Sequence, residues 1–152
     1  MLKVNKKTVC DIFLQRTEIS SKLGSIGSIE NGSAQSITFE NYKNIVESLS
    51  IALLNLGLKQ QSKVCILSHT RKDWHLLDMS ILCTGAISVP IYPNYPSKDI
   101  LFIIEHCEAE VLIIENEEQF KKIVSISEDL KSLKKIICIE SIDQGLKNQL
   151  KI

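Results

Sequence analysis

The chain has 152 residues, in which 18 Lys and Arg residues are balanced by 18 Asp and Glu residues, and its hydrophobic content is 44%. This length is typical of one compact domain, and the hydrophobic content is sufficient for a core. The balanced charge argues against a protein that holds nucleic acid by electrostatics, because that mode of binding needs an excess of basic residues. No apolar run approaches the ~18 residues that a membrane-spanning helix requires.

The cysteine pattern indicates the compartment. The five cysteines are widely spaced, and no Cys-x-x-Cys pair occurs among them. This pattern favours neither a zinc knuckle nor a disulfide framework, and it is typical of free thiols in a reducing environment. The first residues also lack the apolar run of a secretory signal. We therefore expect a cytoplasmic protein whose contact with a membrane is peripheral at most.

The N-terminal part predicts a helix and a hairpin. Apolar residues at helical spacing predict a short helix over 8–19. The Gly/Ser-rich stretch that follows contains Asn31-Gly32, a strong signal for a two-residue hairpin turn. We expect Lys22–Ile29 to pair with Gln35–Thr38.

A long amphipathic helix is predicted next. Thr38 is a suitable N-cap, although Asn41 stands where a full capping box would have Glu or Gln. Gly57 is a suitable end, because glycine readily adopts the left-handed conformation that closes helices. The apolar face of this helix consists of Tyr42, Ile45, Val46, Leu49, Ala52, Leu53 and Leu56.

From residue 63 onward, short apolar runs alternate with helical patterns. Pro90 should place its strand at a sheet edge or end it, and Ser97 is a suitable helix cap. This βαβαβαβ order predicts an α/β fold, in which a parallel sheet has helices on both faces. The predicted strands are 63–68, 86–91, 111–115 and 136–139, and the predicted helices are 71–84, 97–107, 116–124 and 131–134. The tail from Asp143 to Ile152 is polar and shows no cap.

In open α/β sheets, ligands bind beyond the carboxyl ends of the strands. This rule points to Ser68-His69-Thr70, to the segment Tyr92–Pro96 and to Glu115-Asn116. His69 is the best candidate for acid–base chemistry, because imidazole titrates near neutral pH. It would need an orienting partner, which the sequence does not identify. The plainer interpretation is a loop histidine that bonds to backbone.

The other residues that could bind a ligand or take part in catalysis are expected to have structural roles. Gly24–Gly27 lacks the spacing of a phosphate-binding loop and is expected to be a plain turn. No catalytic, cofactor-binding or metal-binding residue is therefore assigned. The side chains expected to pack in the core or lie in solvent are His75, His106, Cys65, Cys83, Cys138, Trp74, Glu108, Glu110, Glu117 and Glu118.

Several short motifs stand together in order between Ser36 and Ile123. The most specific is Gly85–Pro93 (GAISVPIYP), preceded by Lys63–Ser68 (KVCILS) and Arg71–Trp74 (RKDW). Together with the helix entry after Ser36 and the Leu-Gly exit, they resemble the adenylate-forming acid–CoA ligases. The long-chain fatty acyl-CoA synthetase branch is the most similar.

The resemblance implies a two-step reaction for a complete family member. ATP and a fatty acid give an acyl-adenylate and pyrophosphate, and the thiol of coenzyme A then displaces AMP. Mg²⁺ and cationic groups offset the phosphate charge in the first step. ATP, Mg²⁺, coenzyme A and a fatty acid are thus the implied cofactors and partners.

One family motif does not occur in these residues. The family's ATP-phosphate loop is rich in Ser, Thr and Gly and ends in Pro-Lys-Gly. After Thr84 the chain has no threonine, and after Gly85 its only glycine is Gly145. No family functional residue therefore transfers to this chain. We expect an N-terminal fragment that is inactive alone, with a helix and hairpin in 1–35, an α/β subdomain in 36–142 and a polar tail in 143–152.

Two alternatives remain open. A flavodoxin-like module would bind a small ligand such as a flavin, with Ser68 and Thr70 as a thin version of the phosphate loop. A structural fragment would instead pair with the remainder of a ligase or with another copy of itself through an apolar face. A response-regulator receiver is not favoured, because no aspartate stands at a strand end.

Overall fold

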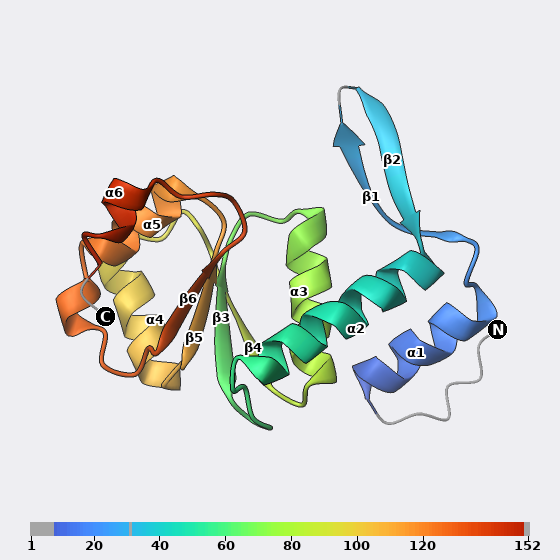
Figure 1. Cartoon of the computed structure of the whole chain (residues 1–152), viewed down its shortest axis with the longest axis horizontal. Helices are drawn as coiled ribbons and strands as arrows, with labels where there is room; N and C mark the ends of the chain where they lie inside the picture. Colours follow the sequence, from blue (N-terminus) through green and yellow to red (C-terminus); the bar gives the residue numbers. More distant parts are fainter. Residues whose placement is uncertain (1–7, 31, 151–152) are drawn as a thin grey trace. The chain divides into compact units, whose positions relative to one another are not determined.

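The computed structural model describes residues 8–30 and 32–150 (Figure 1). Contacts divide the chain into two compact units, one formed by residues 1–59 and 71–85 and the other by 60–70 and 86–152. These units cross the predicted boundaries after residues 35 and 142, because they follow packing in space rather than order in the chain. The division of the sequence into three segments stays a prediction.

The first unit consists of helices and a hairpin. It contains α1 (Val9–Ile19), β1 (Gly24–Glu30), β2 (Ser33–Thr38), α2 (Phe39–Asn55) and α3 (Lys72–Cys83). Both predicted ends of α2 are confirmed. The Thr38 hydroxyl accepts a hydrogen bond from the Asn41 backbone N–H at 3.2 Å, and Gly57 has φ of +94°.

One buried apolar cluster of the first unit joins α1, α2 and α3. Phe13, Tyr42, Val46 and Leu76 are buried in one cluster, and the rings of Phe13 and Tyr42 meet edge to face at 4.8 Å. The predicted apolar face of α1 is only partly used, because Phe13 is buried while Val9 is 57% exposed.

The hairpin turns where the sequence predicts it. Strand β1 pairs antiparallel with β2 across residues 31–32, and Gly32 has φ of +76°. Asn31 lies outside the described residues. The expectation of a plain turn at Gly24–Gly27 is wrong, because these residues form the first part of β1.

The second unit contains the parallel sheet that the sequence predicts. Strands β3 (Lys63–Leu67), β4 (Ile87–Ile91), β5 (Val111–Ile114) and β6 (Lys135–Cys138) run parallel in the order β4-β3-β5-β6. The α/β class is confirmed. Pro90 lies in β4, which is an edge strand, so its missing N–H removes no bond from the centre of the sheet.

Helices α4 (Ser97–Cys107) and α5 (Glu117–Val124) pack against one face of this sheet. A 3₁₀ turn (Ser127–Asp129) and α6 (Gln144–Lys147) complete the unit. Among the described residues, no helix is both long and apolar enough to cross a membrane. The core of this face includes Leu67, Leu112 and Ile114 from the strands and Ile100, Ile104, Phe120 and Ile123 from the helices.

Two predicted helix features are corrected. Pro96, not Ser97, precedes α4, and the Ser97 hydroxyl instead accepts a hydrogen bond from the Ser125 hydroxyl at 3.0 Å. Residues 131–134 are not helical. The Glu105 carboxylate accepts hydrogen bonds from the backbone N–H groups of Lys131 and Ser132 at 3.0 and 3.1 Å, so these donors are satisfied without a helix.

The expected polar tail also differs. The Asp143 side chain caps α6 by accepting a hydrogen bond from the Leu146 N–H at 3.1 Å. Leu146 and Leu150 pack against the core of the second unit. Two leucines spaced four residues apart therefore place this segment against the domain.

Candidate functional site

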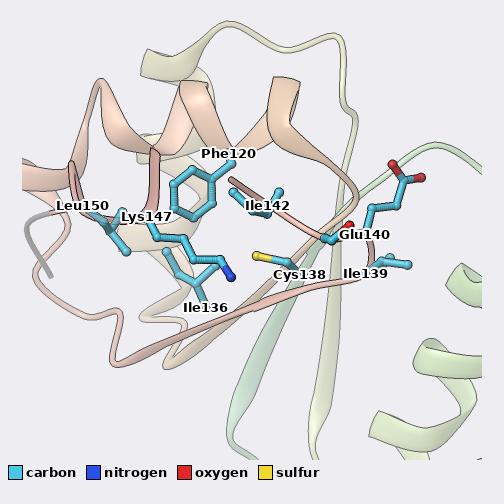
Figure 2. A pocket seen from close by; sticks show the side chains of 9 residues that line it. Phe120, Ile136, Cys138, Ile139, Glu140, Ile142, Lys147 and Leu150 are labelled. Carbon is cyan, nitrogen blue, oxygen red and sulfur yellow. The ribbon is translucent and has the colours of Figure 1, made fainter. Parts of the chain in front are cut away.

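A hollow of about 550 Å³ lies beside the edge strand β6. Phe120, Ile136 and Leu150 give it an apolar lining, and Figure 2 shows the Lys147 side chain reaching from α6 toward β6. Burial raises the pKa of the Cys138 thiol here, while the Lys147 charge opposes that shift. Among the lining residues that the structure describes, Lys147 is the only cation, so these residues offer no cluster of positive charge for a triphosphate.

The three segments that the sequence predicts beyond the strands do meet at one side of the sheet. Leu67, the last residue of β3, pairs with Ile91 of β4 and with Ile114 of β5, so these three strands end level with one another. His69, Tyr92 and Glu115 follow directly. We define the strand-end cluster as Ser68, His69, Glu115, Asn116 and Gln119.

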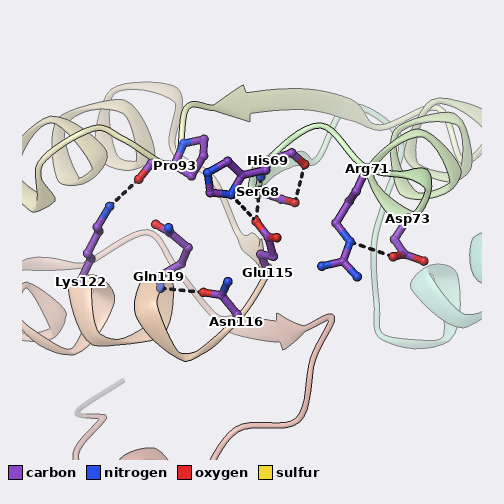
Figure 3. A network of polar contacts seen from close by, with 9 residues as sticks. All are labelled: Ser68, His69, Arg71, Asp73, Pro93, Glu115, Asn116, Gln119 and Lys122. Atoms are coloured by element: carbon purple, nitrogen blue, oxygen red, sulfur yellow. Dashed lines mark hydrogen bonds and ion pairs between the residues drawn. The ribbon is translucent and has the colours of Figure 1, made fainter. Parts of the chain in front are cut away.

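His69 and Glu115 form the centre of this cluster (Figure 3). The Glu115 Oε2 atom accepts the His69 backbone N–H at 2.8 Å and lies 2.9 Å from His69 Nδ1. The Glu115 side chain is only 11% exposed, whereas that of His69 is 56% exposed. The histidine therefore has the orienting partner that acid–base chemistry requires, together with access to solvent.

The position of this pair follows from the strand order. The chain crosses from β3 to β4 on one side and then returns to β5 on the other side of β3. Such a reversal opens a crevice between the two strands, which is the usual ligand position in α/β folds. Here the His69–Glu115 contact bridges the ends of β3 and β5 at that point. It holds the two strand ends together.

Most of the neighbouring polar side chains form hydrogen bonds with backbone groups. Ser68 is buried, and its hydroxyl donates to the His69 carbonyl at 2.8 Å. The Asn116 side chain caps α5 by accepting the Gln119 N–H at 3.2 Å. A flavin-binding interpretation therefore gains no support from Ser68, whose hydroxyl already has a partner.

Gln119 is the exception within the strand-end cluster. It is 0% exposed, and neither its Oε1 nor its Nε2 atom has a hydrogen-bond partner among the described residues. Close by, the Lys122 ammonium donates to the carbonyl of Pro93 and lies 3.5 Å from that of Tyr95 (Figure 3). This lysine ties α5 to the loop after β4. No pattern in the sequence distinguishes Gln119 or Lys122 from other helix residues.

The remaining candidates do not join the cluster. His106 stacks on Phe102 along α4 with ring centroids 5.3 Å apart, and Glu110 pairs with Lys134 at 2.8 Å. In the first unit, Arg71 pairs with Asp73 at 2.9 Å. Over the ranges 8–30 and 32–150, no three His, Cys, Asp or Glu side chains gather in a way that could hold a metal ion.

Comparison with known proteins identifies the family. Residues 17–151 match the family model described as AMP-binding enzyme. This match covers most of the chain, and the chain therefore belongs to the AMP-binding enzyme family. It also extends beyond the stretch from Ser36 to Ile123 that carries the resemblance in sequence.

The curated relatives are named as long-chain-fatty-acid–CoA ligases. FadD15 of Mycobacterium bovis is 28% identical over 103 residues, which cover 68% of this chain and 17% of the relative. The protein heimdall of Drosophila melanogaster is 26% identical over 138 residues, covering 88% of this chain and 20% of the relative. The chain thus spans about a fifth or less of these proteins.

Solved structures agree on the fold. An anthranilate CoA ligase, AuaEII, in complex with anthranoyl-AMP aligns with a TM-score of 0.77 at 23% identity, covering 88% of this chain and 25% of that one. The N-terminal domain of FACL13 from Mycobacterium tuberculosis aligns with a TM-score of 0.78 at 18% identity, covering 95% of this chain and 35% of that one. At this level of identity the likeness concerns the fold alone.

Proposed function

We propose that this chain forms the N-terminal scaffold of a long-chain fatty acid–CoA ligase. The observation that carries the proposal is the family match over 17–151, combined with curated relatives that are named for this activity. The complete enzyme would use ATP, Mg²⁺ and coenzyme A to activate a fatty acid.

The 152 residues would serve this reaction as a framework. The strand-end cluster offers one histidine and one glutamate, and the nearby Lys122 is already held by backbone carbonyls. The cluster lacks the row of donors that stabilises a transferring phosphoryl group. We therefore propose that the isolated chain is inactive. The loop that binds the ATP phosphates would come from a part of the complete ligase outside these 152 residues.

The same proposal places the protein in the cytoplasm. All five thiols are free, which fits the reducing cytoplasm in which fatty acid activation would take place. The scaffold would then meet lipid substrate only as part of the complete ligase.

A chimera tests the scaffold role. In FadD15 of Mycobacterium bovis, the matched segment is replaced by the corresponding segment of this chain, and palmitoyl-CoA formation from palmitate, ATP and coenzyme A is measured. We expect product from the chimera. We expect none from FadD15 lacking the segment. A folded, monodisperse chimera that makes no product would contradict the proposal.

A further inference from the structure

Two thiols of the second unit lie in contact. The sulfur atoms of Cys65 and Cys107 are 3.8 Å apart. Cys65 lies in β3 and is 0% exposed, and Cys107 is the last residue of α4 and packs against the same core cluster. A strand and a helix that are 42 positions apart in sequence therefore bring two reduced cysteines together.

A backbone hydrogen bond and a side-chain ion pair connect the elements that carry the two thiols. Directly after α4, the Glu110 N–H donates to the Lys63 carbonyl at 3.1 Å, and the Glu108 carboxylate lies 3.8 Å from the Lys63 ammonium. Lys63 opens the strand that carries Cys65. The end of α4 is thus fixed to the start of β3, and the two thiols face each other because of the fold rather than a chance rotamer.

The geometry points to a modification site: we propose that Cys65 and Cys107 form an intramolecular disulfide when the folded chain meets a peroxide. A disulfide needs a sulfur–sulfur distance of about 2.05 Å. Starting from 3.8 Å, the two sulfur atoms must approach by about 2 Å. Rotation of both cysteine side chains about their Cα–Cβ bonds can provide this movement.

The reaction balances in two steps. The partly exposed Cys107 sulfur attacks one oxygen of hydrogen peroxide, the O–O bond breaks, and a sulfenic acid and water form. The Cys65 sulfur then attacks the Cys107 sulfur, the S–O bond breaks, and a second water leaves with the Cys65 proton. Two thiols lose two electrons in total, and one peroxide becomes two waters. Burial, together with the neighbouring Cys107, raises the pKa of the Cys65 thiol and makes the second step slow.

The test isolates this pair from the other cysteines. Cys83 hydrogen-bonds with Cys10, and Cys138 lines the hollow beside β6, so these three are changed to serine. The matched control keeps Cys65 and Cys138 and carries Cys10→Ser, Cys83→Ser and Cys107→Ser. Strand β5 separates β3 from β6, which places Cys65 and Cys138 about 10 Å apart, beyond disulfide reach.

Both variants are treated with hydrogen peroxide in native buffer and analysed by intact mass and thiol titration. We expect the pair variant to lose both thiols and the mass of two hydrogen atoms as a monomer, with full recovery after dithiothreitol, and the control to form no such product. A folded pair variant that keeps both thiols, gains only oxygen atoms or links only between molecules would overturn the proposal. If the pair variant fails to fold, peptide mapping of the oxidised wild-type chain decides, through the presence or absence of a linked Cys65–Cys107 peptide.

Discussion

Glu115 holds the ends of two strands through one oxygen atom. That atom accepts both the backbone N–H and the ring of His69, and the carboxylate is nearly buried. Changing Glu115 to alanine leaves the His69 N–H without this partner. We expect the free energy of unfolding to fall by about 1–3 kcal/mol.

His69→Ala is the matched control for this prediction, because it removes the ring and keeps the backbone bond to Glu115. Its loss of stability should be the smaller of the two, measured by urea denaturation for both variants. Equal losses would show that the ring, rather than the backbone bond, holds the strand ends.

Gln119 carries a buried amide that has no partner among the described residues. Methionine has a similar shape and no hydrogen-bonding demand, so Gln119→Met should raise the free energy of unfolding by about 1 kcal/mol. The exposed Gln149→Met is the control and should change stability little. A clear loss of stability for Gln119→Met in thermal unfolding would mean that the amide does have a partner.

At the scale of residues, the sequence predicts positions better than pairings. Ser68, His69, Glu115 and Asn116 are each predicted to lie at or just beyond the end of a strand, and in the structure all four follow the strand ends. The His69–Glu115 contact joins residues 46 positions apart, and no local pattern encodes such a pair. In the sequence, Gln119 does not differ from other polar helix residues. Its burial depends on the segments that pack over α5.

At the scale of elements, periodicity predicts most helices and strands, and the missing N–H of Pro90 predicts that its strand lies at an edge or ends there. The wrong predictions at Ser97 and at residues 131–134 are explained by contacts between residues that are distant in sequence. The Ser97 hydroxyl accepts a hydrogen bond from Ser125, and the Glu105 carboxylate of α4 accepts the backbone N–H groups of residues 131 and 132. Such partners become visible only after the chain has folded.

Strand β1 contains a glycine that the hairpin requires. A Cβ atom at Gly27 would lie 2.9 Å from the Gln35 carbonyl oxygen, whereas one at Gly24 would meet the more adjustable Ser36 hydroxyl at 3.3 Å. Gly27→Ala should therefore destabilise the hairpin, with faster amide hydrogen exchange across β1 and β2. The same substitution at Gly24 should have a smaller effect, and similar exchange in both variants would rule out this explanation.

Helix α2 contributes a buried tyrosine whose ionisation opposes folding. Burial raises the pKa of Tyr42 to about 12, with further contributions from Asp78 and Cys83, and the hydroxyl donates to the His75 carbonyl at 3.2 Å. The unfolded phenol ionises near its ordinary pKa of about 10. The contribution of the neutral Tyr42 side chain to the free energy of unfolding is therefore complete below pH 10 and is lost as the pH rises toward 12.

Tyr42→Phe should flatten the loss of stability over this alkaline range, as measured by urea denaturation at several pH values. The control Tyr92→Phe alters a tyrosine that is 72% exposed and should keep the wild-type slope. An unchanged slope in Tyr42→Phe would exclude this residue as the source.

At the scale of the whole molecule, the family resemblance is visible in the sequence and the packing is not. The motif GAISVPIYP leads to the ligase family, and the family match confirms it. The division into two units is not predicted, because α3 follows β3 directly in sequence yet groups with α1 and α2. Contacts between distant segments decide that grouping.

We propose that these 152 residues form a scaffold that does not activate a fatty acid with ATP on its own. Palmitate-dependent exchange of labelled pyrophosphate into ATP tests this proposal, measured with the isolated, folded chain and Mg²⁺, beside a full-length long-chain ligase as the positive control. We expect exchange no higher than in a blank without protein. Palmitate-dependent exchange that rises in proportion to the concentration of the chain would contradict it.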